Sequence, residues 1–388
     1  MISSTEHVSA FSGATKPNLG ILCLSRSFGG LEMNTLKFAG WLRERGWNLT
    51  LFVLTNSPLH QGAQHQGIAC VSTARHRKYF DVTGARWLAH NLKRLQIPVL
   101  ILTQNREMDL VSLTKLRLGK SLKLIYQQHM QLGPPKRDVV HSLRFMALDA
   151  WLSPLNLLAA EVESKTRFNP DRVYVVPIGI NLDRFVSPGV TTVAARQQLQ
   201  LPAQTPLLGI LGRIDAGKGQ DFVVSVLHHL RTENKLPVEL VIMGEPTKNE
   251  GDAYWNALQQ QVQELDLAQV VHFRPFSEHA EVFFQAIDVF VLASANETYG
   301  MVTIEAMASA RPVVATRSGG TTEIIQDEIT GLLYPPRDLQ ACAQCVARYI
   351  HDPEQAHQIA QLAQREAQRK YSHHRQCELT EAIIYSIL

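Results

Sequence analysis

The chain has 388 residues, of which 45% are hydrophobic and 19% are charged, so its length suits two domains and its composition a soluble globular protein with a substantial core. No continuous run of about 18 apolar residues is present, which excludes a predicted membrane span. The net charge of +3 hides a division: residues 1–187 hold 23 Lys and Arg against 12 Asp and Glu, whereas residues 188–388 hold 15 against 23. Opposite charges in the two halves indicate separate domains with different partners.

The first 18 residues are predicted to be a flexible tail, because they are polar and small. They lack the basic start and apolar centre of a secretory signal. The five cysteines are odd in number and sparse, which favours reduced thiols in the cytosol. Cys342 and Cys345 form a C-x-x-C pair, but no second pair or histidine cluster accompanies them, and we expect neither a zinc site nor a redox site there.

Strand and helix patterns alternate through the first half of the chain. An apolar strand at 19–25 precedes a helix at 31–45, which Gly46 ends at a typical C-cap position. Helices are also predicted at 84–96 and 154–167, and further strands at 48–55, 99–103, 122–127, 150–153 and 172–176. This alternation predicts a parallel sheet with helices on both faces.

A linker with Pro177, Pro188 and Gly189 follows, and then the pattern starts again. Strands are predicted at 207–211, 238–243, 270–273, 288–293 and 313–316, with helices at 220–231, 253–265, 278–286 and 300–310. From 340 onward the chain is helical, and the segment 373–388 carries an apolar stripe that must pack on another surface. The predicted fold class is therefore α/β, with two doubly wound Rossmann-like domains whose ligands bind at the carboxyl ends of strands.

Two glutamates eight positions apart mark a turn in the second half. Glu297 lies between the strand at 288–293 and the helix that begins at Gly300, and Glu305 lies about a turn and a half inside that helix. Free backbone N–H groups and the helix dipole make such a turn a natural anion site. Because phosphate repels a carboxylate, we expect Glu297 to bind hydroxyl groups, and phosphate with hydroxyl groups indicates a nucleotide sugar. The alternative is that both glutamates are simply solvated.

The segment 212–219, GRIDAGKG, lies directly after one strand and before a helix. Its glycines permit a tight turn and close backbone approach, and Arg213 and Lys218 offer two cations to one anion. The spacing is not that of a P-loop. Taken alone, this segment is better explained as a surface loop with two solvated cations. Since Glu297 lies at the same end of the same predicted sheet, the two cations can converge with it on one diphosphate.

Several ordered motifs resemble those of the retaining glycosyltransferases of family 4. They are the runs 294–316, 318–320 and 330–333, the segment 212–219, Gly29-Gly30-Leu31-Glu32, and the run 176–185. The resemblance covers essentially the whole chain after residue 18 and is strongest over 207–335.

This resemblance implies the GT-B fold, in which two Rossmann-like domains face each other across a cleft. Residues 19–187, joined by the C-terminal helix 373–388, are then the N-terminal acceptor domain. Residues 188–372 are the C-terminal domain, which binds the nucleotide-sugar donor.

The motif match also implies roles for the residues of the second half. Arg213 and Lys218 are expected to hold the donor diphosphate and to neutralise its charge as it leaves. Glu297 is expected to hydrogen-bond the hydroxyls of the donor sugar, and Glu305 the ribose hydroxyls. Three backbone amides are expected near the sugar and phosphate, those of Tyr299, Gly300 and Met301.

In the first half, the resemblance implies that Gly30, together with Gly29, lets its loop approach the phosphate when the cleft closes. His129 is expected beside the donor sugar, although Met130 and Gln131 depart from the acidic or small residues common after that histidine. An ordinary core or surface role for His129 stays open. The run 296–300 departs from the commoner Glu-Gly-Phe-Gly, which leaves the identity of the donor sugar open.

The predicted function is a retaining glycosyltransferase that moves a hexose-type sugar from a nucleotide-diphosphate donor to a glycan or lipid-linked acceptor. The family resemblance points to polysaccharide or lipopolysaccharide synthesis for the cell envelope. No metal or other cofactor is expected. The alternatives are a nucleotide-sugar epimerase or hydrolase on a GT-B scaffold, and a non-catalytic dinucleotide-binding or scaffold protein. The last is disfavoured because no G-x-G-x-x-G follows the first strand.

The excess of cations in the first half allows two interpretations. They are either solvated helix faces, or a surface that meets anionic lipid headgroups or an anionic acceptor. We therefore predict a cytoplasmic protein with a possible peripheral contact at the inner face of the plasma membrane. Nucleic acid is not an expected partner, since no basic groove interleaved with aromatic residues is apparent.

Overall fold

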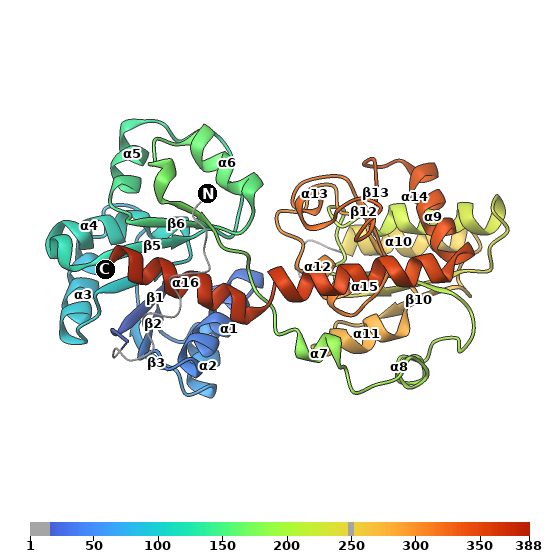
Figure 1. Cartoon of the computed structure of the whole chain (residues 1–388), viewed down its shortest axis with the longest axis horizontal. Coiled ribbons are helices and arrows are strands. Elements are labelled where there is room, and N and C mark those ends of the chain that lie inside the picture. Colours follow the sequence, from blue (N-terminus) through green and yellow to red (C-terminus); the bar gives the residue numbers. More distant parts are fainter. Residues whose placement is uncertain (1–15, 247–251) are drawn as a thin grey trace. The chain divides into compact units, whose positions relative to one another are not determined.

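The computed structural model describes residues 16–246 and 252–388, and most of the tail predicted at 1–18 lies outside them. The chain divides into two compact units, which are shown in Figure 1. Unit 1 comprises Met1–Gly179 and His373–Leu388, and unit 2 comprises Ile180–Ser372.

The first division between the units falls after Gly179, whereas the sequence predicts it after residue 187. The N–H of Ile180 donates to the carbonyl of Tyr371 at 2.9 Å, and the rings of Phe185 and Phe284 pack edge to face at 6.1 Å. These contacts attach the segment to unit 2. The prolines and the glycine that mark the linker in the sequence therefore lie on both sides of the true division.

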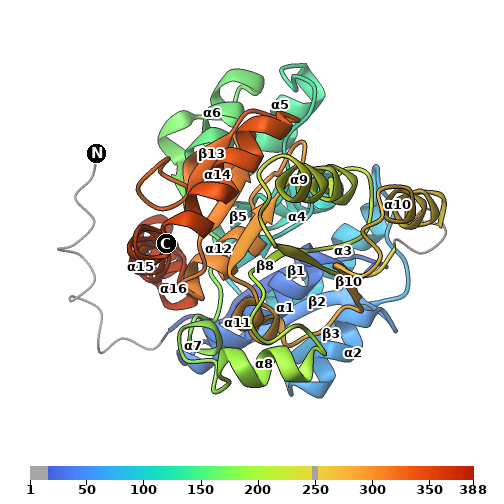
Figure 2. The same ribbon diagram turned by 90° about the vertical axis from the view of Figure 1, so that its right-hand side faces the viewer.

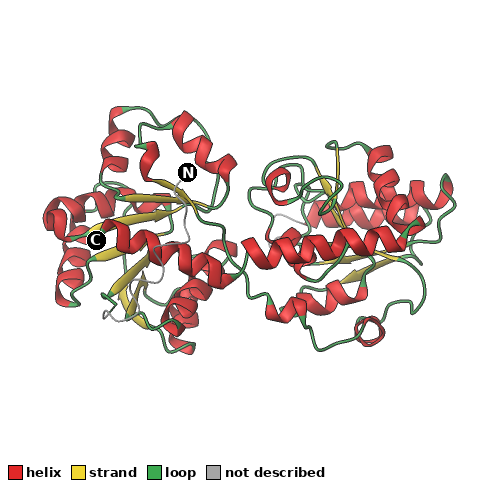
Figure 3. Ribbon diagram, viewed as in Figure 1, coloured by secondary structure: helices red, strands yellow, loops and turns green. Residues whose placement is uncertain are grey.

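Unit 1 contains one parallel sheet of seven strands in the order β3-β2-β1-β4-β5-β6-β7. The strands are β1 (Leu19–Cys23), β2 (Leu49–Leu54), β3 (Ala69–Thr73), β4 (Val99–Leu102), β5 (Lys123–Gln127), β6 (Ala150–Ser153) and β7 (Val173–Val175). The helices are α1 (Gly30–Glu44), α2 (Pro58–His65), α3 (Val82–Arg94), α4 (Met108–Leu118), α5 (Val139–Met146), α6 (Asn156–Lys165) and α16 (His373–Ile387). Figure 3 shows these helices around the strands of the sheet.

The core of unit 1 lies on both faces of this sheet, as the side chains of β1 illustrate. Leu19 and Ile21 belong to one buried cluster, and Leu22 belongs to a second cluster on the opposite face. Successive side chains of a strand point to opposite faces, so a strand covered on both sides must be apolar at every position. This is why the strand sequences are continuous apolar runs rather than alternating patterns.

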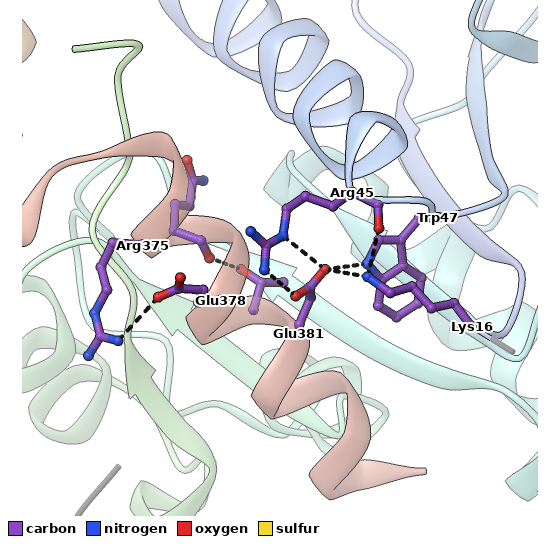
Figure 4. A network of polar contacts seen from close by, with 8 residues as sticks. Lys16, Arg45, Trp47, Arg375, Glu378 and Glu381 are labelled. Atoms are coloured by element: carbon purple, nitrogen blue, oxygen red, sulfur yellow. Dashed lines mark hydrogen bonds and ion pairs between the residues drawn. The ribbon is translucent and has the colours of Figure 1, made fainter. Parts of the chain in front are cut away.

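Helix α16 packs on unit 1, where the residues Cys377, Ile383 and Ile384 of its apolar stripe join the first cluster. Its Glu381 carboxylate accepts hydrogen bonds from Trp47 Nε1 at 2.7 Å, Lys16 Nζ at 2.9 Å and Arg45 NH2 at 2.8 Å (Figure 4). These three donors hold the pKa of Glu381 at about 2, well below its usual value, despite the opposing effect of burial.

Unit 2 contains a second parallel sheet, with six strands in the order β10-β9-β8-β11-β12-β13. The strands are β8 (Leu207–Leu211), β9 (Glu239–Met243), β10 (Val271–Arg274), β11 (Val289–Leu292), β12 (Val313–Thr316) and β13 (Leu332–Tyr334). The helices are α7 (Asp183–Val186), α8 (Thr192–Gln198), α9 (Gln220–Thr232), α10 (Asp252–Glu264), α11 (Ala280–Ala286), α12 (Met301–Ala308), α13 (Thr321–Ile324), α14 (Leu339–His351) and α15 (Pro353–Lys370).

Helices cover both faces of the second sheet. Residues of α9, α10 and α14 form one buried cluster with the strands, and these three helices lie on one side of the sheet in Figure 2. On the other face, Phe283 of α11 comes so close to Gly209 of β8 that a Cβ there would lie 2.7 Å from its ring. The predicted fold class, α/β with two doubly wound Rossmann-like domains, is confirmed.

Candidate functional site

Two loops meet at the carboxyl edge of the unit 2 sheet, because β8 and β11 are neighbouring parallel strands. The β8–α9 loop holds residues 212–219, and the β11–α12 turn holds residues 293–300. The N–H of Ala295 donates to the carbonyl of Gly217 at 3.2 Å, which ties one loop directly to the other. This edge is where a doubly wound sheet binds its ligands.

The β8–α9 loop is held by its own hydrogen bonds. Asp215 Oδ1 accepts the N–H of Gly217 at 2.9 Å, and the carbonyl of Asp215 accepts the N–H of Lys218 at 3.0 Å. Gln220 Nε2 donates to the carbonyl of Arg213 at 2.8 Å. Gly219 has a φ of 74°, and a Cβ on it would lie 2.6 Å from the carbonyl oxygen of Ala293. The loop therefore presents a fixed backbone from which the two cations extend.

Lys218 and Glu297 are brought together by these loops. The Lys218 ammonium lies 2.9 Å from Glu297 Oε2, with the lysine side chain 30% exposed and the glutamate 17% exposed. The pair is therefore partly screened from water, but a ligand can still reach it. Its members are the cation and the carboxylate that the sequence assigns to diphosphate and sugar.

Arg213 follows the same strand but does not join this pair. Its side chain is 70% exposed, and its nearest carboxylate is Asp215 at 3.9 Å. The Arg213 guanidinium thus extends into solvent from a backbone that the loop's hydrogen bonds hold in place.

The loop that follows β12 holds the β11–α12 turn in place through hydrogen bonds to its backbone carbonyls. Ser318 Oγ donates to the carbonyl of Ala295 at 3.0 Å, and the N–H of Gly320 donates to the carbonyl of Glu297 at 2.7 Å. Gly319 has a φ of 54°, and a Cβ on it would lie 2.3 Å from the carbonyl oxygen of Glu297. A glycine is required here on both counts.

Helix α12 begins at Met301, four residues after Glu297. Gly300 is its N-cap, with a φ of 92°, and the N–H of Thr303 donates back to the Gly300 carbonyl at 3.0 Å. The amides of Gly300 and Met301 come before this first helical bond, so they stand at the positive end of the helix dipole. Tyr299 is buried, and Glu305 is half-buried in the second turn.

Two hydroxyl groups beside this turn are orphaned among the described residues. Ser294 Oγ and Thr303 Oγ1 are both buried, and neither has a hydrogen-bond partner in the parts of the chain that the structure describes. Buried polar atoms of this kind are normally satisfied, by water if not by protein. Their presence on either side of Glu297 indicates a site that a polar ligand or water completes.

The remaining predicted site residues belong to unit 1. Gly29 caps α1 and donates its N–H to Glu32 Oε2 at 2.8 Å, whereas a Cβ on Gly30 would meet nothing within 4 Å. His129 follows β5, and its Nε2 is buried without a partner among the described residues. Burial lowers the pKa of His129 to about 4, against a small opposing effect of the Glu32 carboxylate. The imidazole is therefore neutral near pH 7.

Four residues of this architecture have no role assigned from sequence. Asp215 shapes the β8–α9 loop, Gly319 supports Glu297, and Gly244 packs so closely that a Cβ on it would lie 1.9 Å from the Gly212 carbonyl oxygen. Glu107, in unit 1, is fully buried, and burial raises its pKa to about 8. The glycines are visible in the sequence as turn residues, but nothing there signals the burial of Glu107.

No group of three or more His, Cys, Asp or Glu side chains suited to a metal occurs within the described ranges. Cys342 and Cys345 are reduced and lie on α14, where burial raises the pKa of each thiol. None of the described helices combines the length and the apolar character needed to cross a membrane.

Two family models match this chain. The model described as "Glycosyl transferases group 1" matches residues 193–366, and that described as "Glycosyltransferase Family 4" matches residues 28–184. A D-inositol 3-phosphate glycosyltransferase of Corynebacterium urealyticum is 32% identical over 216 residues, which are 54% of this chain and 50% of that protein. The chain thus spans about half of the length of the curated relatives that it matches.

Solved structures share the fold over nearly the whole chain. A glycosyltransferase from Rickettsia africae has a TM-score of 0.87 at 17% identity and covers 96% of this chain and 99% of its own. HepE of Anabaena, solved in complex with UDP, has a TM-score of 0.81 at 18% identity and covers 96% and 100%. HepE has also been solved with UDP-glucose, with a TM-score of 0.76, 19% identity and coverage of 96% and 100%.

Proposed function

Because the chain belongs to the glycosyltransferases of group 1 and family 4, with the GT-B fold, we propose that it transfers a sugar from a nucleotide-diphosphate donor. The acceptor is a glycan or a lipid-linked saccharide, and the anomeric configuration is retained. One observation carries the proposal, the 2.9 Å ion pair of Lys218 and Glu297 beside the N-terminus of α12.

The ion pair matches the two chemical parts of such a donor. A diphosphate needs cations and N–H donors, which Lys218, Arg213 and the first amides of α12 supply. A sugar needs hydrogen-bond acceptors for its hydroxyls, and an ionised carboxylate is an acceptor with two oxygens. In the absence of donor, Lys218 and Glu297 satisfy one another. On binding, each exchanges its partner for the part of the donor that it fits.

The proposed mechanism follows from the charge that develops during transfer. Cleavage of the bond from the anomeric carbon to the diphosphate oxygen leaves negative charge on the diphosphate and an oxocarbenium-like sugar. Lys218, Arg213 and the α12 amides stabilise the leaving diphosphate, and such preorganised donors are each worth about 10²–10³ in rate. The acceptor oxygen attacks from the face that the diphosphate leaves, and a diphosphate oxygen takes the acceptor proton. Glu297 orients the sugar and is not a nucleophile.

We propose no metal cofactor. The cationic side chains and the helix amides can stabilise the negative charge on the leaving diphosphate, which a divalent ion would otherwise neutralise. His129 and the Gly29-Gly30 loop complete the proposal from unit 1. The neutral His129 ring hydrogen-bonds the donor sugar, and Gly30 leaves room for a phosphate beside the loop. Glu305 binds the ribose of the donor nucleotide.

We propose a uridine diphosphate sugar as the first donor to test, because HepE binds UDP and UDP-glucose. The likeness to HepE is one of fold, so guanosine and adenosine donors stay open. For the acceptor, we propose an envelope glycan or its lipid-linked precursor. The inositol phosphate acceptor named for the relatives is a second candidate, which the cationic first half of the chain favours.

The test begins with thermal-shift measurements against UDP-, GDP- and ADP-sugars, followed by transfer assays with the donor that stabilises the protein most. Binding without turnover in the absence of acceptor supports a transferase. Turnover of free donor without acceptor would favour an epimerase or hydrolase on the same scaffold. No stabilisation by any nucleotide sugar, with native melting behaviour, would contradict the proposal.

We also propose a cytoplasmic location with peripheral contact at an anionic membrane, on the strength of the cations in residues 1–187. An anionic surface adds about 1 kcal/mol of attraction for each nearby Lys or Arg. A lipid-linked acceptor would place the enzyme at such a surface.

A further inference from the structure

Helix α5 of unit 1 presents an apolar stripe to solvent. The exposed fractions are 67% for Val139, 62% for Leu143 and 72% for Met146, and Val140 beside them is also exposed. The first three share one face of the helix by their spacing, while Phe145 on the opposite face is 1% exposed and belongs to the core. Large aliphatic side chains thus lie on both the solvent face and the core face of this short helix. Exposing them to water is unfavourable, and an exposed apolar patch of this kind marks a surface that contacts a partner or a membrane.

The loop between β3 and α3 extends this apolar surface. Tyr79 and Phe80 are consecutive and exposed, Phe80 to 78%. The Arg144 guanidinium of α5 lies 5.6 Å from the centre of the Tyr79 ring, so the loop lies against α5. Phe80 also has a φ of 49°, a left-handed conformation that a bulky residue rarely adopts. The fold thus holds an exposed aromatic ring in a loop that contacts α5.

Cations surround this surface. Arg77, Lys78 and Arg137 are all exposed, and the Lys78 ammonium lies 4.9 Å from the Tyr79 ring. The neighbouring acids are already engaged: Asp81 accepts the N–H groups of Arg77 and Gly84, Asp138 caps α5 through the N–H of His141, and Asp109 pairs with Arg144. The side chains of Asp81 and Asp109 are only 8% and 11% exposed, whereas that of Asp138 is 55% exposed, so three exposed cations stand against one exposed carboxylate next to the stripe.

We infer that α5 and the 77–80 loop form a docking surface for an anionic lipid bilayer. Aliphatic side chains rimmed by Lys and Arg fit the boundary between acyl chains and anionic headgroups. An acidic protein partner would complement the cations, but a surface this rich in unpaired aliphatic groups fits hydrocarbon better. In Figure 1, α5 lies at the outside of unit 1 beside α4. The inference rests on the proposed function only in that a lipid-linked acceptor would lie in the same bilayer.

The docking surface is tested by flotation of the full chain with vesicles of phosphatidylcholine, with and without phosphatidylglycerol, in the absence of donor and acceptor. We expect binding to the anionic vesicles and at least tenfold less to the neutral ones. The double variant Leu143→Ser with Met146→Ser should lose at least tenfold of the anionic binding, as should Arg77→Glu with Lys78→Glu. All four positions are at the surface, so the melting temperature should be unchanged.

Two matched controls come from unit 2. Val193 on α8 is 71% exposed, and Lys235 is an exposed cation in the loop after α9, so Val193→Ser and Lys235→Glu should leave binding unchanged. A Phe80→Trp reporter should shift its emission to the blue with anionic vesicles. Equal binding to both kinds of vesicle would overturn the inference, as would normal binding by the Leu143→Ser, Met146→Ser double variant. Self-association of the wild type that this double variant abolishes would also overturn it. Nucleotide binding, measured separately by thermal shift, reports on the proposed function whatever the vesicles show.

Discussion

The ammonium of Lys218 lies 2.9 Å from Oε2 of Glu297, although 79 positions separate the two residues in the chain. Neighbouring parallel strands carry them to the same sheet edge, and the hydrogen bond from Ala295 to Gly217 fixes the two loops together. We propose that the pair is a resting arrangement, in which each group holds the other in place until a ligand with both phosphate and hydroxyl groups replaces the contact.

Lys218→Ala is expected to lower kcat/KM for transfer by about 10²–10³, because one preorganised donor to the leaving diphosphate is lost. Stability should change by no more than about 1 kcal/mol, since the ion pair is partly exposed. Kinetics with the stabilising donor and a thermal melt measure both quantities. Lys235→Ala is the control, and near-normal turnover by Lys218→Ala would remove the lysine from the site.

Glu297→Gln and Glu297→Ala separate the charge of the carboxylate from its hydrogen bonds. If Glu297 orients the sugar by accepting hydroxyl hydrogens, both variants lose transfer, and Gln keeps more of it than Ala because its amide oxygen still accepts. Donor affinity should fall less than kcat, since the diphosphate contacts remain. Measuring kcat and KM for both variants tests this, and full activity in Glu297→Ala is the result that would count against the role.

Gly319→Ala is expected to destabilise the protein by about 1–3 kcal/mol, because the new Cβ would meet the Glu297 carbonyl at 2.3 Å and the residue has a positive φ. The clash is with backbone, so it can be relieved only by moving the turn that carries Glu297, and transfer should fall as well.

Gly30→Ala is the contrasting change. Its Cβ would meet nothing within 4 Å, and an Ala in the first turn of α1 is compatible with the backbone, so the melting temperature should be kept or slightly raised. Transfer should nevertheless fall if the loop must approach phosphate closely. Equal activity in Gly30→Ala and wild type would show that this glycine serves the fold alone.

The stability of unit 1 is expected to fall in acid through Glu381. Its pKa in the folded state is about 2, below the ordinary glutamate value of about 4.5, so its stabilising effect is complete above pH 4.5 and is lost as the pH falls towards 2. Glu381→Gln should therefore lower the free energy of unfolding by about 2 to 3 kcal/mol at pH 7, with a clear fall in melting temperature, and should hardly change either quantity near pH 2.

Glu378 is the matched control for this change. It lies on the same helix and contacts only Arg375 among the ion pairs of the described residues, at 3.6 Å and with 40% of its side chain exposed (Figure 4). Glu378→Gln should have little effect at either pH. A pH-independent difference between Glu381→Gln and the wild type would contradict the depressed pKa.

His129 is expected to remain neutral from pH 8 down to about pH 5, because burial lowers its pKa to about 4. Nuclear magnetic resonance of histidine-labelled protein can follow the His129 ring directly. A midpoint for His129 near pH 6 or above would show that water reaches the ring.

The strands were predictable from the sequence where they are buried on both faces, as in β1 and β11, because a continuous apolar run leaves little choice of structure. The edge strand β3, Ala69–Thr73, was not predicted, since it is half-exposed and carries Ser and Thr at its end. The exposed stripe of α5 was not recognised either. Its aliphatic spacing is the same as that of a helix face that packs inward.

For the site, the sequence could place Lys218 and Glu297 at the same end of one sheet, where both could reach one ligand, but it could not predict that they form a direct ion pair. Their contact depends on β8 and β11 being neighbours in the sheet, a non-local pairing with no local sequence signal. The exposure of Arg213 and the support of Glu297 by Gly319 depend in the same way on the path of separate loops.

The most direct test is a crystal structure of the full chain with the nucleotide sugar that raises its melting temperature most. The account predicts diphosphate oxygens within hydrogen-bonding distance of Lys218 Nζ and of the first amides of α12, with Glu297 on the sugar hydroxyls and the Lys218–Glu297 contact exchanged for the ligand. A diphosphate bound elsewhere, with that ion pair intact, would contradict it.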